Sequence, residues 1–419
     1  MHKMQLDGIV LVEQQTDDYF PFSILHPQWE LRTGLFQHWE RIQHQFQNVP
    51  LQFLGRPDQT SLYFEKNPHL IQQNAIQGTI LFLDARFVPS IDFAADIFSV
   101  LENHSTNDIS IIEKNTNTII GVIRHFEQST SLAAFSEFFF ENSTKHVSVT
   151  GVTIQYIWDA IYANSEIILR DALTLPASTI TPQHLWQFGV FSYADGKPIH
   201  IGENVQLHAT VVLDSRNGPI IIGDNSTIMA HTVIFGPCVI GENTIINANT
   251  SITGGSTVGP NCRVRGEISV SIFQSFANKA HDGFLGHSFV SEFANLGAGT
   301  ITSNLKNTYG NLTLEFPQQR KIQTGKQFIG SIIGDHSKTA IGTTLNSGTV
   351  IGVMSTIAVP GFPPKFIDNF SWLLNGTNEQ VILSKALSVM EHVKSRRNQP
   401  IYNSERSILT KLFNDKNAL

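Results

Sequence analysis

Aliphatic residues recur at six-residue intervals through the middle of this chain. The eleven positions are Ile201, Leu207, Leu213, Ile222, Ile228, Ile234, Ile240, Ile246, Ile252, Val258 and Val264, and one insertion, at residues 217–219, interrupts the count. A period of six fits neither the 3.6-residue period of a helix nor the two-residue alternation of an ordinary strand. It is typical of a solenoid in which a short parallel strand and a turn repeat, the hexapeptide β-helix.

A second, smaller position repeats four residues after each aliphatic one. It holds Val205, Val211, Ser226, Thr232, Cys238, Thr244, Thr250, Ser256 and Cys262. The chain has only two cysteines and both fall on this position, so we expect small, buried, unbridged side chains. This cysteine usage is consistent with a cytoplasmic location.

The repeat continues less regularly beyond Val264. Val270 and Phe276 keep the step of six, and Phe284, Val290 and Leu296 resume it after a slip of two residues. Residues 304–326 are too polar and irregular for a coil, which predicts a loop or hairpin there. Coil-like sequence returns at residues 333–357.

The first 190 residues show no repeat. Apolar runs predict strands at Gly8–Val12, Thr79–Leu83, Thr118–Ile123 and His146–Ile154, and helical patterns lie at Leu35–Phe46 and Ala133–Phe140. Alternation of strands and helices favours a layered α/β domain. We therefore divide the chain into an α/β domain at 1–190, a β-helix at 198–372 and a tail at 373–419.

The tail carries a helical pattern. Residues 377–380 have the sequence of a capping box, and apolar residues at helical spacing follow, with a second short helix expected after Ser404. Because the open end of a solenoid must be covered, we interpret these helices as a cap or packing element.

Composition narrows the partners. The 419 residues include 15% charged residues and carry a formal net charge of −7, with no basic block. We therefore expect no nucleic-acid partner. No run of 18 apolar residues occurs, so we expect no membrane span, and the first residues are interpreted as a strand and not a signal peptide.

Several ordered motifs narrow the chemistry. Two are Asn278-Lys-Ala-His-Asp-Gly-Phe-Leu-Gly286 and Asn295-Leu-Gly-Ala-Gly-Thr300, and others lie at 305–309, 334–339, 362–365 and 370–372. They resemble the acetyltransferase half of bacterial bifunctional N-acetylglucosamine-1-phosphate uridyltransferase/glucosamine-1-phosphate N-acetyltransferases, and more closely a divergent Bacteroidetes-type branch. The resemblance is dense from about residue 198 to 372.

The resemblance implies a reaction of UDP-N-acetylglucosamine biosynthesis or a related one. His281 matches the general base that takes a proton from the sugar amine as the amine attacks acetyl-CoA, and imidazole titrates near neutral pH. Asn295 and Asn304 match positions that bind the amino-sugar phosphate. Taken alone, in a chain with 16 histidines, His281 is better interpreted as an exposed or structural histidine, and Asn295 can be a turn asparagine. The motif makes the functional interpretation of His281 the better one, and a metal role for His281 with His287 ranks well below it.

The chain departs from the family at three positions. The family tyrosine after the histidine is Phe284 and a family lysine is Ser269, while the phosphate-binding arginine has no counterpart at its spacing. Arg263, Arg265, Lys279, Lys306 and Lys338 are candidates to supply the positive charge. The acceptor sugar is therefore left open.

For the N-terminal half, the resemblance implies a nucleotidyltransferase-like domain. This chain lacks the glycine-rich phosphate loop of the family there. Arg32, followed by Gly34, matches a phosphate contact, although a surface arginine is as good an interpretation. Asp84 matches a Mg²⁺ ligand at a strand end, and Asp159 is a weaker candidate. His26 stands where the branch has an arginine.

Three functions follow. The first is an acetyl-CoA-dependent N-acyltransferase acting on an amino-sugar phosphate. The second is a sugar-1-phosphate nucleotidyltransferase, Mg²⁺-dependent if active, whose β-helix serves assembly. The third is a degenerate binder of nucleotide sugar or acyl-CoA. The resemblance also implies a left-handed β-helix and a homotrimer with the acyl site between subunits.

Overall fold

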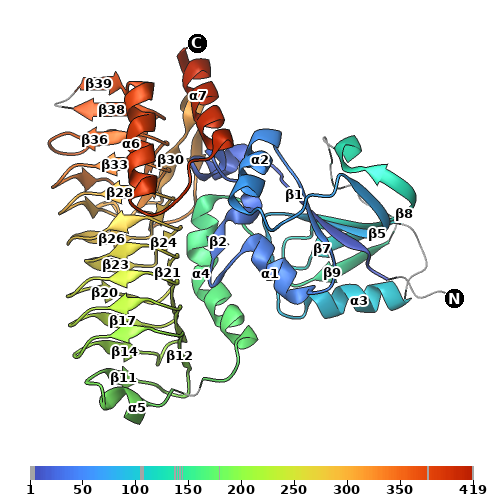
Figure 1. Ribbon diagram of the computed structural model, residues 1–419, viewed down its shortest axis with the longest axis horizontal. Helices are drawn as coiled ribbons and strands as arrows, with labels where there is room; N and C mark the ends of the chain where they lie inside the picture. The colour runs from blue at the N-terminus through green and yellow to red at the C-terminus, as the bar shows by residue number, and fades with distance from the viewer. Residues whose placement is uncertain are drawn as a thin grey trace.

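The structure is a computed structural model, and it describes residues 5–103, 108–135, 138, 140, 143, 145–178, 180–374 and 377–417. An α/β part and a long β-helix lie side by side, with helix α4 (Ile157–Asp171) between them (Figure 1). A mixed α/β domain, a parallel β-helix and a helical tail were expected, and this fold class is confirmed.

The α/β part is built on one mixed sheet. Its strand order is β4-β1-β5-β8-β7-β9, with β1, β4 and β5 parallel. The strands are β1 (Gly8–Val12), β4 (Leu51–Leu54), β5 (Ala75–Asp84), β7 (Asp108–Glu113), β8 (Thr118–Ser131) and β9 (His146–Val149). Its helices are α1 (His38–Gln45), α2 (Pro57–Lys66) and α3 (Phe93–Asn103), and two short strand pairs join β2 (Arg32–Thr33) to β3 (Phe36–Gln37) and β6 (Phe87–Pro89) to β10 (Gly151–Thr153).

Two predicted helices in this part are shorter than expected. Residues 36–37 form β3, so only the remainder of Leu35–Phe46 is helix α1. The helix expected at Ala133–Phe140 is reduced to a 3-10 helix, Leu132–Phe135, and residues 136, 137 and 139 lie outside the described residues. In the first segment, pairing of β3 with β2 takes the residues at which the helix was expected to begin.

The β-helix has three parallel sheets. The six-stranded sheet contains β11 (Phe191–Tyr193), β14 (Val212–Asp214), β17 (Val233–Phe235), β20 (Ser251–Ile252), β23 (Glu267–Ser269) and β26 (Phe284–Gly286). The nine-stranded sheet contains β12 (Ile199–Ile201), β15 (Ile220–Ile222), β18 (Cys238–Ile240), β21 (Ser256–Val258), β24 (Ile272–Phe273), β27 (Phe289–Val290), β32 (Ser331–Ile333), β35 (Thr349–Ile351) and β37 (Phe366–Ile367). The ten-stranded sheet contains β13 (Gln206–Leu207), β16 (Thr227–Ile228), β19 (Ile245–Ile246), β22 (Arg263–Val264), β25 (Asn278–Lys279), β28 (Asn295–Leu296), β33 (Lys338–Thr339), β36 (Thr356–Ala358), β38 (Ser371–Leu374) and β39 (Thr377–Gln380), the last antiparallel.

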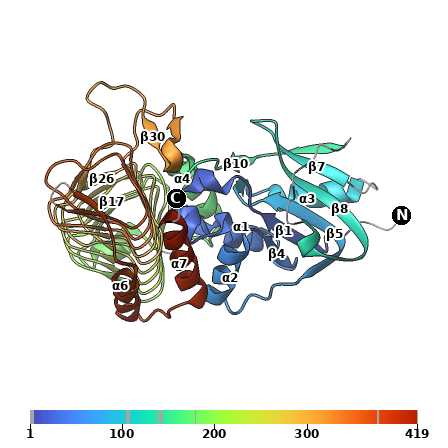
Figure 2. The ribbon, with the colours of Figure 1, turned by 90° about the horizontal axis from the view of Figure 1, so that it is seen from above.

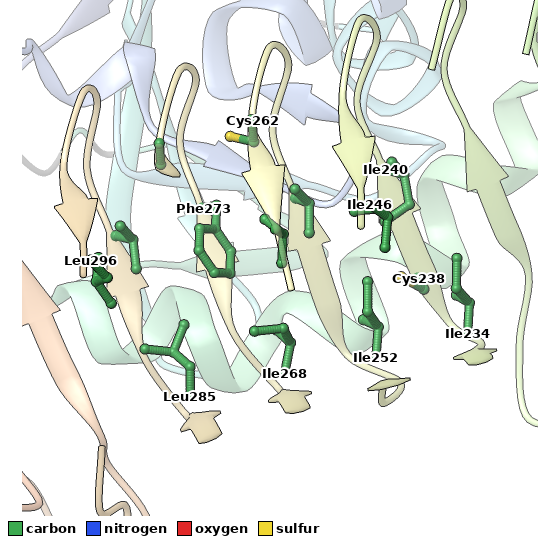
Figure 3. Close-up of a cluster of buried hydrophobic side chains, with 14 of the residues drawn as sticks. Ile234, Cys238, Ile240, Ile246, Ile252, Cys262, Ile268, Phe273, Leu285 and Leu296 are labelled. Carbon is green, nitrogen blue, oxygen red and sulfur yellow. The ribbon is translucent and has the colours of Figure 1, made fainter. Parts of the chain in front are cut away.

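The six-residue repeat marks the inside of these coils. Its aliphatic residues from Leu213 to Val264 are buried in one continuous core, and Figure 3 shows several of them stacked from coil to coil. Cys238 and Cys262 are fully buried in the same core, and burial raises the pKa of each thiol to about 12. Both are therefore inert packing residues, as predicted.

Beyond Val264 the predicted register is wrong at Val270, Phe276 and Phe284, and it is correct again at Val290 and Leu296, which are buried in the core. The buried positions are Ile268, Phe273, Lys279 and Leu285, whereas Val270 and Phe276 are turn residues with positive φ and Phe284 faces outward. The reason is a shorter coil: Val258 pairs with Phe273, fifteen residues on, whereas Ile240 pairs with Val258, eighteen residues on. The step of six is lost where the turns shorten.

The break at 304–326 contains a hairpin, as expected. Strands β30 (Thr313–Glu315) and β31 (Lys321–Gln323) pair antiparallel. Two further strands, β29 (Ile301–Thr302) before the hairpin and β34 (Thr344–Leu345) after it, pair in parallel with each other. Figure 2 shows the hairpin beside α4, projecting from the side of the coils.

The tail differs from its prediction at the start. Residues 377–380 form strand β39, and helix α6 (Leu383–Ser395) begins three residues later, followed by α7 (Asn403–Asn417). The two helices lie along the side of the last coils and reach α2, so they are a packing element and not an end cap (Figures 1 and 2). At the opposite end, α5 (Pro182–Trp186) buries Leu185 against the core of the first coils.

The two parts share one core. Trp158 of α4 and Phe22 pack with Ile272, Phe289 and hairpin residues of the β-helix. Asn164 adds polar contacts, because its Nδ2 donates to the Gly255 oxygen at 2.9 Å and its Oδ1 accepts from the Gly34 nitrogen at 2.7 Å. None of the described helices is long and apolar enough to cross a membrane.

Candidate functional site

His281 occupies the turn between β25 and β26, at a corner between the ten-stranded and six-stranded sheets. Its side chain is exposed, and its imidazole has no hydrogen-bond or ion-pair partner in the described part of the chain. An exposed, unpaired imidazole keeps its nitrogen lone pair available to a ligand.

The turn that carries His281 is held from three sides. Lys279 Nζ donates to the His281 oxygen at 2.9 Å, Asn247 Nδ2 to the Ala280 oxygen at 3.0 Å, and the Gly299 nitrogen to the Asp282 oxygen at 3.2 Å. These bonds fix the backbone, so the imidazole is presented on a rigid support. A rigid support suits a residue whose position must be held accurately.

Lys279 does not reach the surface. It takes an inward position beside Val264, is fully buried, and also donates to the Arg265 oxygen at 3.3 Å. Burial lowers the pKa of its ammonium to about 8. In this arrangement Lys279 positions the His281 turn and offers no charge to a phosphate. Arg265 is half-exposed beside the turn and pairs with Asp282 at 2.9 Å.

Asn295 lies on the outer face of the ten-stranded sheet. It neighbours Asn278 on the adjacent strand, and the Asn278 amide donates to its Oδ1. Both asparagines line a cavity of ≈ 360 Å³ together with Arg263 and Lys338. The structure therefore combines a predicted sugar-binding asparagine with two of the cations considered from the sequence.

Asn304 lies on the other side of the His281 corner. Its amide nitrogen donates to His287 Nδ1 at 2.9 Å, and the His287 ring stacks on Phe328 with centroids 5.3 Å apart. Burial lowers the pKa of His287. A side chain at Gly286 would collide with both the Phe284 ring and the Asn304 amide. Phe284 and Asn304, both named from the motifs, are therefore neighbours.

Asp84 ends β5, as predicted, but its carboxylate is already occupied. Arg86 donates through Nε to Oδ1 at 3.0 Å and through Nη2 to Oδ2 at 2.7 Å, and its backbone nitrogen donates to Oδ1 at 2.9 Å. The described residues contain no group of three or more side chains suited to a metal ion. The residues present do not fit a Mg²⁺ ion on Asp84.

The loop after β1 is also filled by the protein itself. The Gln14 nitrogen donates to Gln28 Oε1 at 2.8 Å, Gln28 Nε2 donates to the Gln14 oxygen at 2.6 Å, and Glu13 pairs with Arg56 at 2.9 Å. A phosphate cradle needs backbone N–H groups free to donate. Here a buried glutamine takes that place.

The remaining N-terminal candidates have structural contacts. Arg32 is largely buried; its Nη1 donates to the Leu35 oxygen at 2.6 Å and its backbone nitrogen to Gln274 of the β-helix at 3.2 Å. Asp159 accepts from the Tyr156 nitrogen at 2.9 Å at the start of α4, and burial raises the pKa of its carboxyl. Both stabilise the junction with the β-helix or the start of α4.

Sequence reasoning missed part of this surface. Arg396 and Arg397 line the cavity beside Asn295 although they lie more than 100 residues from it in the chain. Their pair in a helical tail carried no motif. Asn278 lies inside the motif that contains His281. Its position next to an exposed strand was the signal that could have identified it as a site residue.

Comparison with known proteins relates part of the chain to sugar nucleotidyltransferases. Residues 9–179 match a family described as sugar nucleotidyl transferase. The chain is 30% identical over 91 residues to a bifunctional sugar-1-phosphate nucleotidylyltransferase/acetyltransferase from Sulfurisphaera tokodaii, covering 22% of each protein. It is 29% identical over 119 residues to the bifunctional protein GlmU of Methanococcus vannielii, covering 28% of each. The matches thus span about a quarter of the length of these relatives, both of which are named as bifunctional proteins.

Among solved structures, the chain is similar to LpxA, a UDP-N-acetylglucosamine acyltransferase from Bacteroides fragilis. The identity is 16% with a TM-score of 0.24, and the match covers 52% of this chain and 94% of that one.

Proposed function

We propose that this protein is a transferase of amino-sugar metabolism that moves an acyl group from acyl-CoA to the amine of a sugar phosphate. The observation that carries the proposal is His281, an exposed and unpaired imidazole on a turn fixed by Lys279. Asn295 lies on the sheet that leads into the His281 turn, and Asn304 contacts His287 just beyond the strand that follows the turn. The similarity to sugar nucleotidyltransferases supports the substrate class.

The reaction requires one proton transfer. The neutral amine attacks the thioester carbonyl, the new N–C bond forms, and the C–S bond breaks to release the thiol of CoA. His281 accepts the proton that the amine loses and returns it to the departing sulfur. The asparagine amides would hold hydroxyls or phosphate oxygens and so orient the amine.

The test is His281→Ala, with acetyl transfer to glucosamine-1-phosphate and related amino sugars followed by release of free CoA. We expect kcat to fall by roughly 10²–10⁴, the usual contribution of a general base. His208→Ala is the matched control, since His208 is another exposed histidine of the coils. Unchanged kcat in the His281 variant would remove this residue from the mechanism, and a wild type inactive on every amino sugar would argue against the function.

We further propose a homotrimer with the site between subunits, as in the family that the motifs resemble. His281 stands at an outer corner, and the predicted contacts lie on the two faces that meet there. Sedimentation equilibrium of the full chain is expected to give three times the mass of the chain. A monomer at assay concentrations would exclude a shared site.

A second candidate, sugar-1-phosphate nucleotidyl transfer, is favoured by the match over residues 9–179. The filled loop and the Arg86–Asp84 pair weigh against turnover there. The measurement is pyrophosphate release from UTP or dTTP with a sugar-1-phosphate. Release that Asp84→Asn abolishes would establish the nucleotidyl reaction, and no release would leave this half as a binding or packing domain.

A further inference from the structure

A strongly basic cavity lies between helix α6 and the outer face of the ten-stranded sheet. Its cations are Arg263 from β22, Lys338 from β33, and Arg396 and Arg397 just after α6. No carboxylate among the described residues lines it, and its volume of ≈ 360 Å³ falls within the roughly 300–1,000 Å³ typical of small-molecule sites. In a protein of net charge −7, four cations around one cavity create a local positive potential that favours binding of an anion.

The cations are held together against their mutual repulsion. Burial, and then the like charges of Arg263 and Arg396, lower the pKa of Arg397. The Arg397 guanidinium donates to the backbone oxygen of Asn261 at 3.4 Å, and Lys338 Nζ donates to the His336 oxygen at 2.8 Å. Neutral oxygens satisfy donors without cancelling charge. A multiply charged anion would complete the arrangement.

The wall next to the cations is aromatic and strained. Phe276 and Phe293 stack with centroids 4.9 Å apart, and His336 continues the stack at 5.1 Å from Phe293. All three have positive φ, a conformation that bulky residues rarely adopt, whereas the corresponding corner of earlier coils carries Asn225, Asn243 and Asn261. Strain of this kind concentrates at functional sites. Val393 of α6 adds a further apolar contact.

We propose that this cavity binds the diphosphate of a nucleotide, with the phosphates on the arginines and Lys338 and an organic portion against Phe276, Phe293 and Val393. Arginine forks suit phosphate oxygens because they can donate two parallel bonds. Asn278 and Asn295 line the same cavity, on the strands that lead into the His281 corner. The inference extends the proposed function by naming a ligand class for this face, but the binding does not depend on His281.

Two ligands share this chemistry, the nucleotide part of coenzyme A and a nucleoside-diphosphate sugar. Titration calorimetry of the full-length chain with coenzyme A, UDP-N-acetylglucosamine and pyrophosphate distinguishes them. We expect one of the two nucleotides to bind, more weakly as salt is raised. Arg396→Gln and Arg263→Gln, both at exposed positions, should each weaken it by at least about tenfold, the loss expected for one charge-assisted contact.

Arg216→Gln is the matched control, because Arg216 is an exposed coil arginine that pairs with Asp214 away from the cavity. It should leave binding unchanged. Wild-type affinity retained by both cavity variants, or binding of pyrophosphate with neither nucleotide, would overturn the proposal. His281→Ala should bind the nucleotide as tightly as wild type, so a loss of turnover without a loss of binding tests the two proposals separately.

Discussion

Lys279 shows how one side chain can serve the site at the expense of the core. It sits where the neighbouring coils place Val264 and Leu296, yet its ammonium bonds to the carbonyls of Arg265 and His281. A charge at an aliphatic position opposes folding, because burial disfavours the charged form. The compensation is a fixed turn beneath the proposed base.

Lys279→Met should therefore separate stability from activity. Methionine fills a similar volume without a charge, so we expect the free energy of unfolding at pH 7 to fall by no more than about 1 kcal/mol, or to rise. We expect kcat for acyl transfer to fall by about tenfold, because the turn loses its clamp. Chemical unfolding and CoA release measure the two effects, with Lys321→Met, at an exposed lysine of the β30–β31 hairpin, as the control.

The same residue predicts a pH dependence. Its pKa is about 8 in the folded chain, below the ordinary lysine value of about 10.5, so the unfolded chain binds more protons between these values. Lys279 therefore contributes unfavourably below pH 8, and this penalty disappears as pH rises through that window. The Met variant should lack this contribution, so wild type should gain stability relative to the variant between pH 8 and 10.5. A difference in stability that is constant with pH would contradict the burial of a charged lysine.

At the scale of elements, the tail is attached through a buried charge. Glu405 of α7 pairs with Lys394 of α6 and with His336 of the β-helix at 3.1 Å. Burial opposes ionisation of Glu405, but His336 and Lys394 outweigh it and lower the pKa of the carboxyl to about 2. The two helices and the last coils are therefore tied at one point, next to the basic cavity.

Glu405→Gln should loosen α6 and α7. The variant leaves Lys394 buried without its counter-charge, which typically destabilises by about 3–5 kcal/mol. We expect the hydrogen-exchange protection factors of residues 383–417 to fall in the variant. In wild type the same protection factors should fall as pH drops from about 4.5 toward 2. Glu391→Gln removes an exposed contact with Arg406 between the same helices and should change exchange little. Equal effects of the two variants would refute the buried anchor.

At the scale of the whole molecule, His26 joins the α/β part to the β-helix. Its Nδ1 lies 2.7 Å from Glu30 and its Nε2 lies 2.9 Å from Asp335 of the β-helix. Lys66 faces the same group and contacts Glu292 at 3.4 Å. Burial and Lys66 oppose protonation, but the carboxylates outweigh them and raise the pKa of His26 to about 10.

The junction should therefore weaken at alkaline pH. Since the folded pKa exceeds the ordinary histidine value of about 6.5, the stabilisation is complete below pH 6.5 and is lost as pH rises through 10. His26→Ala should lower the free energy of unfolding at pH 6.5 by about 3–5 kcal/mol and by much less above pH 10. The control is His125→Ala, an exposed histidine of the same part. A difference between His26→Ala and wild type that does not change with pH would contradict a protonated bridge.

Sequence alone determined the β-helix, because a period of six is local information that each coil repeats. Through their motif it also predicted that His281, Asn295 and Asn304 belong to one site, and this stays a prediction. It could not follow the register past Val264, where the identity of the inward residue depends on turn length and on pairing with the previous coil. That error placed Phe284 inside and Lys279 on the surface, the reverse of their positions.

Only the tertiary structure decided which groups meet across long separations. Arg263 and Arg397 share a cavity, and His26 meets Asp335, because coils, tail and α/β part pack as one body. Whether a charge is free or already neutralised depends on such neighbours: Asp84 is held by Arg86, and Gln28 fills the loop where a phosphate would need open N–H groups. The period of six shows which residue types recur along the chain, whereas packing determines which partners each residue has.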